Sequence, residues 1–269
     1  MKLTYLGTAA AEGFPALFCN CKYCNEARRL GGKNVRTRSQ SLINNDMLID
    51  YPADSYAHFL NNGIEGDTIK YLLITHSHSD HFYPQDLFMR HTYYAHNRRC
   101  ERLRLICSDA VRQKFECTPP NVDITVISSY ETVELDGYRV TALPARHMKE
   151  GGCFIYIIEG EKTLLYAHDT GYFFDEVFDF IKEKGIKLDM ASFDCTNVNI
   201  PIGDTDGHMG FPNIKRVIDR LTAIGAISDR TVKYVNHFSH NGNPLQDYLE
   251  ENAERIGCKV SFDGCAVEF

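Results

Sequence analysis

The chain has 269 residues, of which 43% are hydrophobic, and it carries a net charge of -7. This length and composition suffice for a sizeable core and are typical of one large globular domain. The acidic balance disfavours binding of long nucleic acids. No apolar run reaches the roughly 18 residues that a membrane span needs, and the first residues resemble a strand rather than a signal peptide. We therefore expect a cytoplasmic protein without a membrane segment.

Short apolar runs along the chain predict strands, and three amphipathic patterns predict helices. Ten strands are expected, at 2–7, 41–51, 70–75, 103–107, 123–128, 138–144, 153–160, 162–167, 187–193 and 231–236. The clearest helix spans 210–225, with Pro212 early and Gly225 just past its end. Segments 173–185 and 244–257 show the same helical pattern. The layout predicts helices on the outsides of two stacked sheets, in a single domain over 1–269, because no linker divides the chain.

A dense group of candidate metal ligands follows the strand predicted at 70–75. The segment THSHSDHF places His76, His78, Asp80 and His81 within six positions, on a loop at the carboxyl end of a strand. Imidazole and carboxylate groups hold zinc, manganese or iron, and four of them at this spacing can reach two adjacent ions. The pattern therefore predicts a metal site.

A second group of ligands lies near the amino terminus, where CNCKYC presents Cys19, Cys21 and Cys24. Three thiolates leave a tetrahedral zinc site one ligand short, and His240 in NHFSHNG is the candidate for the fourth. Three unrelated reduced cysteines are the alternative. The other seven cysteines show no ligand spacing and are expected to be buried thiols: Cys100, Cys107, Cys117, Cys153, Cys195, Cys258 and Cys265.

The THSHSDHF motif resembles the signature of the metallo-β-lactamase superfamily, whose fold is an αββα sandwich with a dinuclear metal site. Further residues of the family pattern follow in order in LPARH, LLYAHDT and VKYVNH. The resemblance implies two ligand sets, namely His76, His78 and His147 for one metal, and Asp80, His81 and His237 for the other. It also implies that Asp169 bridges the two metals and that Asp50, which ends SLINNDMLID, braces the histidine loop.

The cysteine group makes the chain resemble one subgroup of this superfamily in particular. PhnP-type phosphodiesterases have a similar cysteine trio near the amino terminus, closed by a histidine just after the last active-site histidine. Both ends of this chain, TYLGTAAAEGFPALFCNCKYCNEARR and FDGCAVEF, also look like that subgroup. The resemblance implies a structural zinc at the loop 19–24 and two divalent metals, zinc, manganese or iron, in the active site. It implies hydrolysis of a small or cyclic phosphodiester by a hydroxide generated between the two metals.

A histidine that is not a ligand would supply the proton for the leaving group. His208, in the GHMG segment, resembles the non-ligand histidine of phosphodiesterases and of tRNase Z, and we expect it to contact the phosphate as general acid. Asp194, at the end of the strand predicted at 187–193, is expected to orient His208 or to join the hydrogen bonds of the metal site. A loop histidine that caps the next helix is the alternative. Asp80, Asp194 and His208 are thus the predicted catalytic residues.

Other functions use the same constellation. A tRNA 3′-processing nuclease resembles proteins with an inserted RNA-gripping arm, and the 21 residues between His147 and Asp169 leave no room for one there. A thioester or lactone hydrolase would need less from His208. A non-hydrolytic role in cofactor biosynthesis is a further alternative, because the coenzyme PQQ synthesis B proteins share parts of the pattern. A homodimer is a further hypothesis, without an interface motif to support it.

The remaining polar residues near the motifs are expected to have structural or surface roles. His168 precedes Asp169, where the family has a small residue, and we expect it to be structural. Arg146 adjoins His147 and could meet either a substrate phosphate or a surface carboxylate. The histidines on polar or loop segments are expected at the surface, namely His58, His91 and His96.

Overall fold

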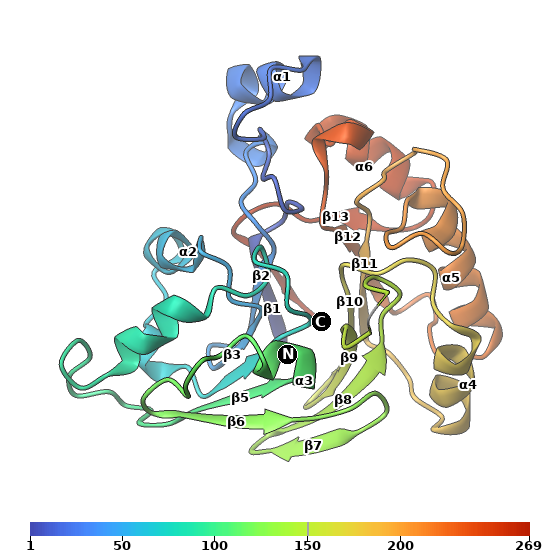
Figure 1. Ribbon diagram of the computed structural model, residues 1–269. Coiled ribbons are helices and arrows are strands. Elements are labelled where there is room, and N and C mark those ends of the chain that lie inside the picture. Colours follow the sequence, from blue (N-terminus) through green and yellow to red (C-terminus); the bar gives the residue numbers. More distant parts are fainter. Residues whose placement is uncertain (150) are drawn as a thin grey trace.

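A computed structural model describes residues 1–149 and 151–269, and it places two seven-stranded sheets face to face (Figure 1). The first sheet has the order β14-β1-β2-β3-β4-β5-β6 and the second β13-β12-β11-β10-β9-β8-β7. The strands of the first sheet are β1 (Lys2–Gly7), β2 (Gln40–Ile43), β3 (Met47–Ile49), β4 (Tyr71–Leu73), β5 (Leu103–Cys107), β6 (Val122–Val126) and β14 (Cys265–Glu268). Those of the second are β7 (Thr132–Leu135), β8 (Tyr138–Pro144), β9 (Phe154–Glu159), β10 (Thr163–Ala167), β11 (Met190–Asp194), β12 (Val232–Asn236) and β13 (Lys259–Val260).

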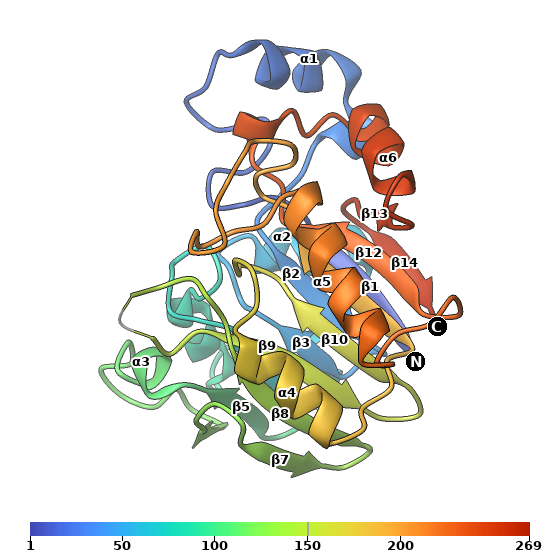
Figure 2. The same ribbon diagram turned by 90° about the vertical axis from the view of Figure 1, so that its right-hand side faces the viewer.

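Helices cover the outer faces of both sheets, so the predicted αββα sandwich is confirmed. Figure 2 shows α4 and α5 lying along the second sheet, whereas α1 stands beyond the sheet edge, near α6. The α-helices are α1 (Lys22–Leu30), α2 (Ser55–Asn62), α3 (Asp109–Arg112), α4 (Asp175–Glu183), α5 (Phe211–Ala223) and α6 (Gln246–Glu254). Short 3-10 helices occupy Gly32–Asn34, Gly66–Thr68, Pro84–Arg90 and His240–Gly242. No helix of the described residues is long and apolar enough to span a membrane.

The helix predicted at 210–225 shows how sequence pattern becomes packing. The observed α5 buries the predicted stripe, including Ile214, Val217 and Leu221, which pack into the core against the second sheet. Pro212 lies in its first turn, where a missing N–H costs nothing. Gly225 follows the last turn with φ of +69°, a conformation that favours glycine.

Three differences from the predicted elements have local causes. The run 41–51 is a hairpin of β2 and β3 rather than one strand, because Asn44 takes φ of +50° and reverses the chain. Strands β7, β13 and β14 were not predicted, because they are short and partly exposed. Helix α1 was not predicted either, since it is short and only two of its residues, Cys24 and Ala27, are buried.

The strand directions gather the candidate residues at one edge. Strands β3 and β4 are parallel, as are β10, β11 and β12, and β8 runs in the same direction as β10 because both are antiparallel to β9. The carboxyl ends of these six strands are followed by the predicted site residues, from Asp50 after β3 to His237 after β12. Loops at such an edge are where layered α/β proteins place chemistry.

Two expectations about individual side chains are wrong. Cys117 is exposed and Cys100 is half-buried, whereas the other five cysteines without ligand spacing are buried as predicted. His58 is buried rather than exposed, with 2% relative exposure. Its ring lies 2.7 Å from Gln40 Oε1 through Nδ1 and 2.7 Å from Thr37 Oγ1 through Nε2, so α2 is fastened to the start of β2. The polar sequence around His58 hid this buried contact.

The buried His58 makes stability depend on pH. Burial lowers the pKa of His58 to about 4, below the ordinary value of 6.5 that it regains on unfolding. The unfolded chain therefore binds more protons between these values, and stability present above pH 6.5 is lost as the pH falls toward 4. We expect His58 to contribute a loss of up to about 3 kcal/mol in the free energy of unfolding across that window. Urea denaturation of wild type and His58→Gln at pH 7 and pH 4.5 checks this, and an equal loss in both would contradict it.

Candidate metal centre

Three imidazoles converge on one point between the sheets. His76 Nε2 lies 2.9 Å from His78 Nδ1, and His147 Nε2 lies 3.1 Å from the same atom. Two nitrogens bound to one tetrahedral zinc lie about 3.3 Å apart. The three ligand atoms and one oxygen of Asp169 lie within 4.8 Å of one another, so this set could hold one metal ion.

A second set lies beside the first and shares Asp169. His81 Nε2 lies 3.2 Å from His237 Nε2 and 3.4 Å from Asp80 Oδ2. Asp169 Oδ2 lies 3.1 Å from both His76 Nε2 and His81 Nε2, one from each set. The carboxylate therefore lies between the two sets, where the sequence resemblance expects a bridging ligand.

Hydrogen bonds behind the site fix which nitrogen of each ring faces the cluster. His147 Nδ1 donates to the carbonyl oxygen of Gly207 at 3.1 Å, which leaves the Nε2 lone pair for a metal. His81 Nδ1 donates to Asp50 Oδ2 at 2.7 Å, with the same result for its Nε2. Asp50 also accepts from the Thr75 backbone N–H at 2.8 Å, so it holds the histidine loop as expected. Such outer partners orient metal-binding histidines and raise their basicity.

The residues present fit a pair of metal ions. Asp50, Asp169 and His237 all have positive φ, between +53° and +65°, which is unusual for residues with a side chain and is concentrated at this edge. Asp169 is buried, and its two oxygens lie among the rings of His76, His81 and His208 at 3.0 to 3.1 Å. A buried carboxylate beside imidazole lone pairs that face one another is a donor set that a cation would satisfy.

The protonation states of Asp169 and of two ligand histidines also suit metal binding, whereas the Asp50 and Asp169 carboxylates outweigh burial and raise the pKa of His81. Burial lowers the pKa of His76 and of His237, so both rings favour the neutral form. Burial alone would raise the pKa of Asp169, but the surrounding histidines outweigh it and hold the pKa well below its usual range. Neutral imidazole and ionised carboxylate are the forms that ligate metals.

His208 lies beside both sets, and its ring has no backbone hydrogen-bond partner among the described residues. Its Nδ1 is 3.0 Å from Asp169 Oδ1 and 3.3 Å from Asp194 Oδ2. Burial alone would lower the pKa of His208, but the Asp194 and Asp169 carboxylates raise it to about 11. Gly171 lets the loop that carries His208 approach, since a Cβ at that glycine would lie 1.8 Å from the Asp206 carbonyl oxygen. The ring keeps 30% of its side-chain surface exposed.

Asp194 is held in place beside His208 by backbone hydrogen bonds. It is fully buried, and it accepts from the backbone N–H of Met209 at 3.0 Å and of Thr196 at 3.1 Å. It therefore positions His208 from behind and joins the hydrogen bonds around His237, whose Nδ1 bonds to Thr196 Oγ1 at 2.7 Å. The predicted contact of Asp194 with His208 is present, while the catalytic role of either residue stays a prediction.

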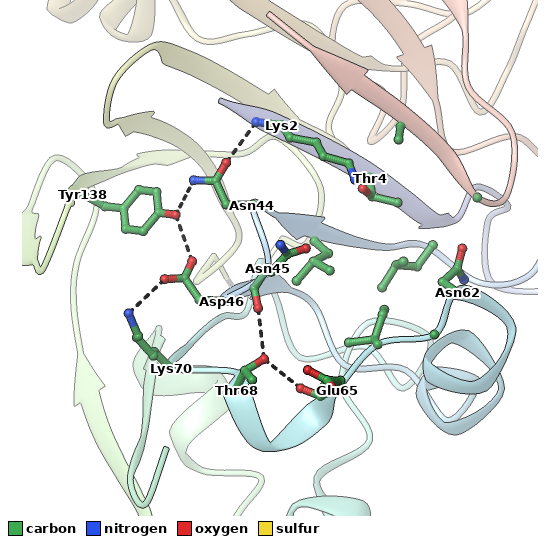
Figure 3. Close-up of a pocket in the computed structure, with 16 residues that line it drawn as sticks. Lys2, Thr4, Asn44, Asn45, Asp46, Asn62, Glu65, Thr68, Lys70 and Tyr138 are labelled. Carbon is green, nitrogen blue, oxygen red and sulfur yellow. Dashed lines mark hydrogen bonds and ion pairs between the residues drawn. The ribbon is translucent and has the colours of Figure 1, made fainter. Parts of the chain in front are cut away.

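A pocket of about 360 Å³ opens over these residues and is lined by members of both ligand sets and by His208. A larger pocket of about 860 Å³ lies elsewhere, on the outer face of the first sheet (Figure 3). Its polar groups bond to one another, as in the Tyr138 hydroxyl, which accepts from Asn44 and donates to Asp46, while Asp46 pairs with Lys70. We assign the chemistry to the smaller pocket, because the two histidine and aspartate ligand sets meet there and its polar groups face the open space.

The four predicted ligands of the structural zinc also meet. His240 Nδ1 lies 3.3 Å from Cys19 Sγ, 3.6 Å from Cys21 Sγ and 3.7 Å from Cys24 Sγ. A nitrogen and a sulfur bound to one tetrahedral zinc lie about 3.6 Å apart. The distances therefore fit one zinc ion.

The position of Cys21 at the start of α1 favours the thiolate form that binds zinc. Cys21 is the N-cap of α1, and its sulfur accepts the backbone N–H of Cys24. Burial slightly opposes ionisation, but hydrogen bonds from His240 and that N–H lower the pKa of Cys21 to about 6. Burial raises the pKa of Cys24 to about 12, which a bound cation would reverse.

The structure also places the residues whose roles the sequence left open. His168 is buried, bonds to Ser192 Oγ at 2.6 Å through Nε2, and lies in the core as a structural residue. Arg146 donates to the Tyr172 carbonyl oxygen and stacks over Phe174, and it forms no ion pair with a carboxylate of the described residues. His91 and His96 are exposed, as predicted.

Sequence reasoning missed several residues that shape the site. Thr75 and Thr196 hold ligand histidines, and Glu12 and Ser239 line the pocket. Thr75 stands next to the motif and could have been found by position. No feature of the sequence marked Glu12 as a site residue, because only the folded chain brings the loop after β1 to this edge.

Comparison with known proteins agrees with the fold. A family model described as Beta-lactamase superfamily domain matches residues 51–237. A diphosphatase from the PhnP family is similar, with 19% identity, a TM-score of 0.77, and coverage of 100% of this chain and 97% of that chain. Zinc-bound PqqB from Methylobacterium extorquens has 19% identity, a TM-score of 0.76 and coverage of 100% of both chains. The short form of human tRNase Z has 13% identity, a TM-score of 0.66, and coverage of 100% and 99%.

No match was found among curated proteins. The fold and the two facing ligand sets define a hydrolase of the metallo-β-lactamase fold, a fold of metal-dependent enzymes. The chain belongs to the beta-lactamase superfamily, because the family model covers more than half of it.

Proposed function

We propose that the protein is a phosphodiesterase that hydrolyses small or cyclic phosphodiesters, with cyclic ribose phosphates as the favoured class. The observation that carries this proposal is the position of His208. Its ring lies beside both ligand sets, although His208 is not one of the predicted metal ligands. A phosphodiester needs charge stabilisation on its phosphoryl oxygens and a proton for the leaving alkoxide. Two divalent metals, zinc, manganese or iron, would supply a nucleophile from water near neutral pH and stabilise the phosphoryl charge.

The chain's own residues would do the rest. The two ligand sets, which share Asp169, would hold the metals, and Asp50, Thr75 and Thr196 orient their histidines from behind. Asp194 fixes His208, whose exposed ring surface faces the pocket. His208 would donate a proton to the leaving oxygen and contact the phosphate. The cysteine set would hold a structural zinc that fastens the loop after β1 to the segment following His237.

Loss of His208 should affect substrates unequally. We expect His208→Ala to lower kcat for a 2′,3′-cyclic nucleotide by about 10²-fold, because its alkoxide leaving group requires a proton. The loss for bis(p-nitrophenyl) phosphate should be much smaller, because p-nitrophenolate leaves without one. Both rates are measured on proteins of equal metal content.

The matched control is His96→Ala, which removes an exposed histidine elsewhere on the surface. Equal losses on both esters would argue against a proton-donating role for His208. No hydrolysis of either ester by the metal-loaded wild type would refute the proposed function and favour thioesters or lactones as substrates.

A further inference from the structure

The pocket over the metal centre has a second wall that the proposed chemistry does not use. It is formed by the loop after β1, by the residue after Thr196 and by the segment after His237. Its polar members are Glu12, Asn197, Ser239 and Asn241. These side chains lie on the same pocket as the ligand sets, so the part of a substrate that does not react would lie against them.

Hydrogen bonds hold this wall in one arrangement. Ser239 Oγ donates to Glu12 Oε1 at 2.6 Å and accepts from Asn241 Nδ2 at 3.1 Å. Glu12 Oε1 also lies 3.9 Å from His240 Nε2, whose other nitrogen faces the cysteines. Within the described residues, Glu12 Oε2 and the side-chain amide of Asn197 receive no hydrogen bond and remain for a ligand. One carboxylate oxygen and amide groups suit hydroxyl groups, which both donate and accept.

The charge of this wall disfavours ligands that carry a second phosphate. No lysine or arginine is among the described residues that line the pocket. Arg38 comes close through the Ala11 carbonyl oxygen, to which its Nε donates at 2.9 Å, but its Nη1 pairs with Asp54 at 3.2 Å. A second phosphate on the part of the substrate that lies against this wall would therefore face the Glu12 carboxylate without a lysine or arginine side chain to balance it.

We propose that Glu12 is a specificity-determining residue, which selects phosphodiesters whose non-reacting part is a neutral, hydroxylated group, such as a ribose, over those that carry a second phosphate. The inference rests on the proposed function and narrows its substrate class. Glu12 accepts a hydrogen bond from a substrate hydroxyl through Oε2, while Asn197 and Asn241 line the same wall with their amide groups. The same carboxylate repels an additional phosphate.

Two substrates that differ only in one phosphate test the inference. Adenosine 2′,3′-cyclic phosphate should have a kcat/KM about tenfold higher than the same compound carrying a 5′-phosphate, with the difference mainly in KM. Glu12→Gln should remove most of that preference, because glutamine keeps the bond from Ser239 and loses the charge. Calorimetric titration with the corresponding nucleoside monophosphate and bisphosphate products measures the same contrast without turnover.

Glu161→Gln is the matched control, since Glu161 is exposed in the turn between β9 and β10, and it should leave the preference unchanged. Equal kcat/KM for both nucleotides, or an unchanged preference in Glu12→Gln, would overturn this inference while the proposed function stands. Failure of the wild type to hydrolyse any phosphodiester, bis(p-nitrophenyl) phosphate included, would overturn both.

Discussion

Asp169→Asn is expected to lower kcat/KM for a phosphodiester by about 10³-fold and to reduce the metal content of the active site. Asp169 Oδ2 lies 3.1 Å from a histidine of each ligand set, so the substitution weakens both metal positions at once. The amide also leaves a buried site without the negative charge that attracts the ions. Asparagine tolerates the φ of +53° at this position, so the backbone should keep its shape. Elemental analysis and steady-state kinetics measure the two effects.

Asp229→Asn serves as the control, because Asp229 is exposed in a turn and lies on another loop. It should retain wild-type metal content and rate. If Asp169→Asn kept two active-site metals per chain and a rate within tenfold of wild type, the assignment of Asp169 as the bridging ligand would be wrong.

Cys24→Ser is expected to remove one zinc per chain and to lower the melting temperature by about 10 °C. Structural zinc contributes several kcal/mol to folding, and a protein of this size loses about 3 °C per kcal/mol. Cys24 is fully buried and packs with Phe14 and Ala27 in the small apolar cluster that joins α1 to the loop after β1. The loop that carries Glu12 should also lose order, since His240 lies beside that carboxylate. Calorimetry and zinc analysis check the result.

The exposed Cys117 provides the matched substitution, and Cys117→Ser should change neither zinc content nor melting temperature. An unchanged zinc content in Cys24→Ser would mean that Cys24 is an ordinary buried thiol, which is the alternative that the sequence left open.

The fold was largely predictable because its strands are apolar and its main helices amphipathic. Strands such as β9 and β10 are buried along nearly their whole length and read as continuous apolar runs. Helix α1 was hard to predict from periodicity, since its buried face is only Cys24 and Ala27 and the cysteine set lies at its start. The hairpin of β2 and β3 was obscured because the turn residues Asn44 to Asp46 interrupt a run that remains apolar on both sides.

The site likewise has residues that the sequence could predict and residues that it could not. Ligand types and spacing predicted which residues would meet, and the structure brings both ligand sets and the cysteine set together. Residues that act through a single long-range contact were not predictable. Glu12 is joined to Ser239 across 227 positions, and Gly207 offers its carbonyl oxygen to His147 across 60. His58 was misplaced for the same reason, because its partners Thr37 and Gln40 precede it on another element.

The most direct test of the account is the hydrolysis of a 2′,3′-cyclic nucleotide as manganese or zinc is titrated into metal-depleted protein. We predict that turnover rises until two active-site equivalents are bound and yields a nucleoside monophosphate, with the structural zinc retained throughout. Saturation of the active site with two metals without any turnover of the cyclic ester would contradict the account.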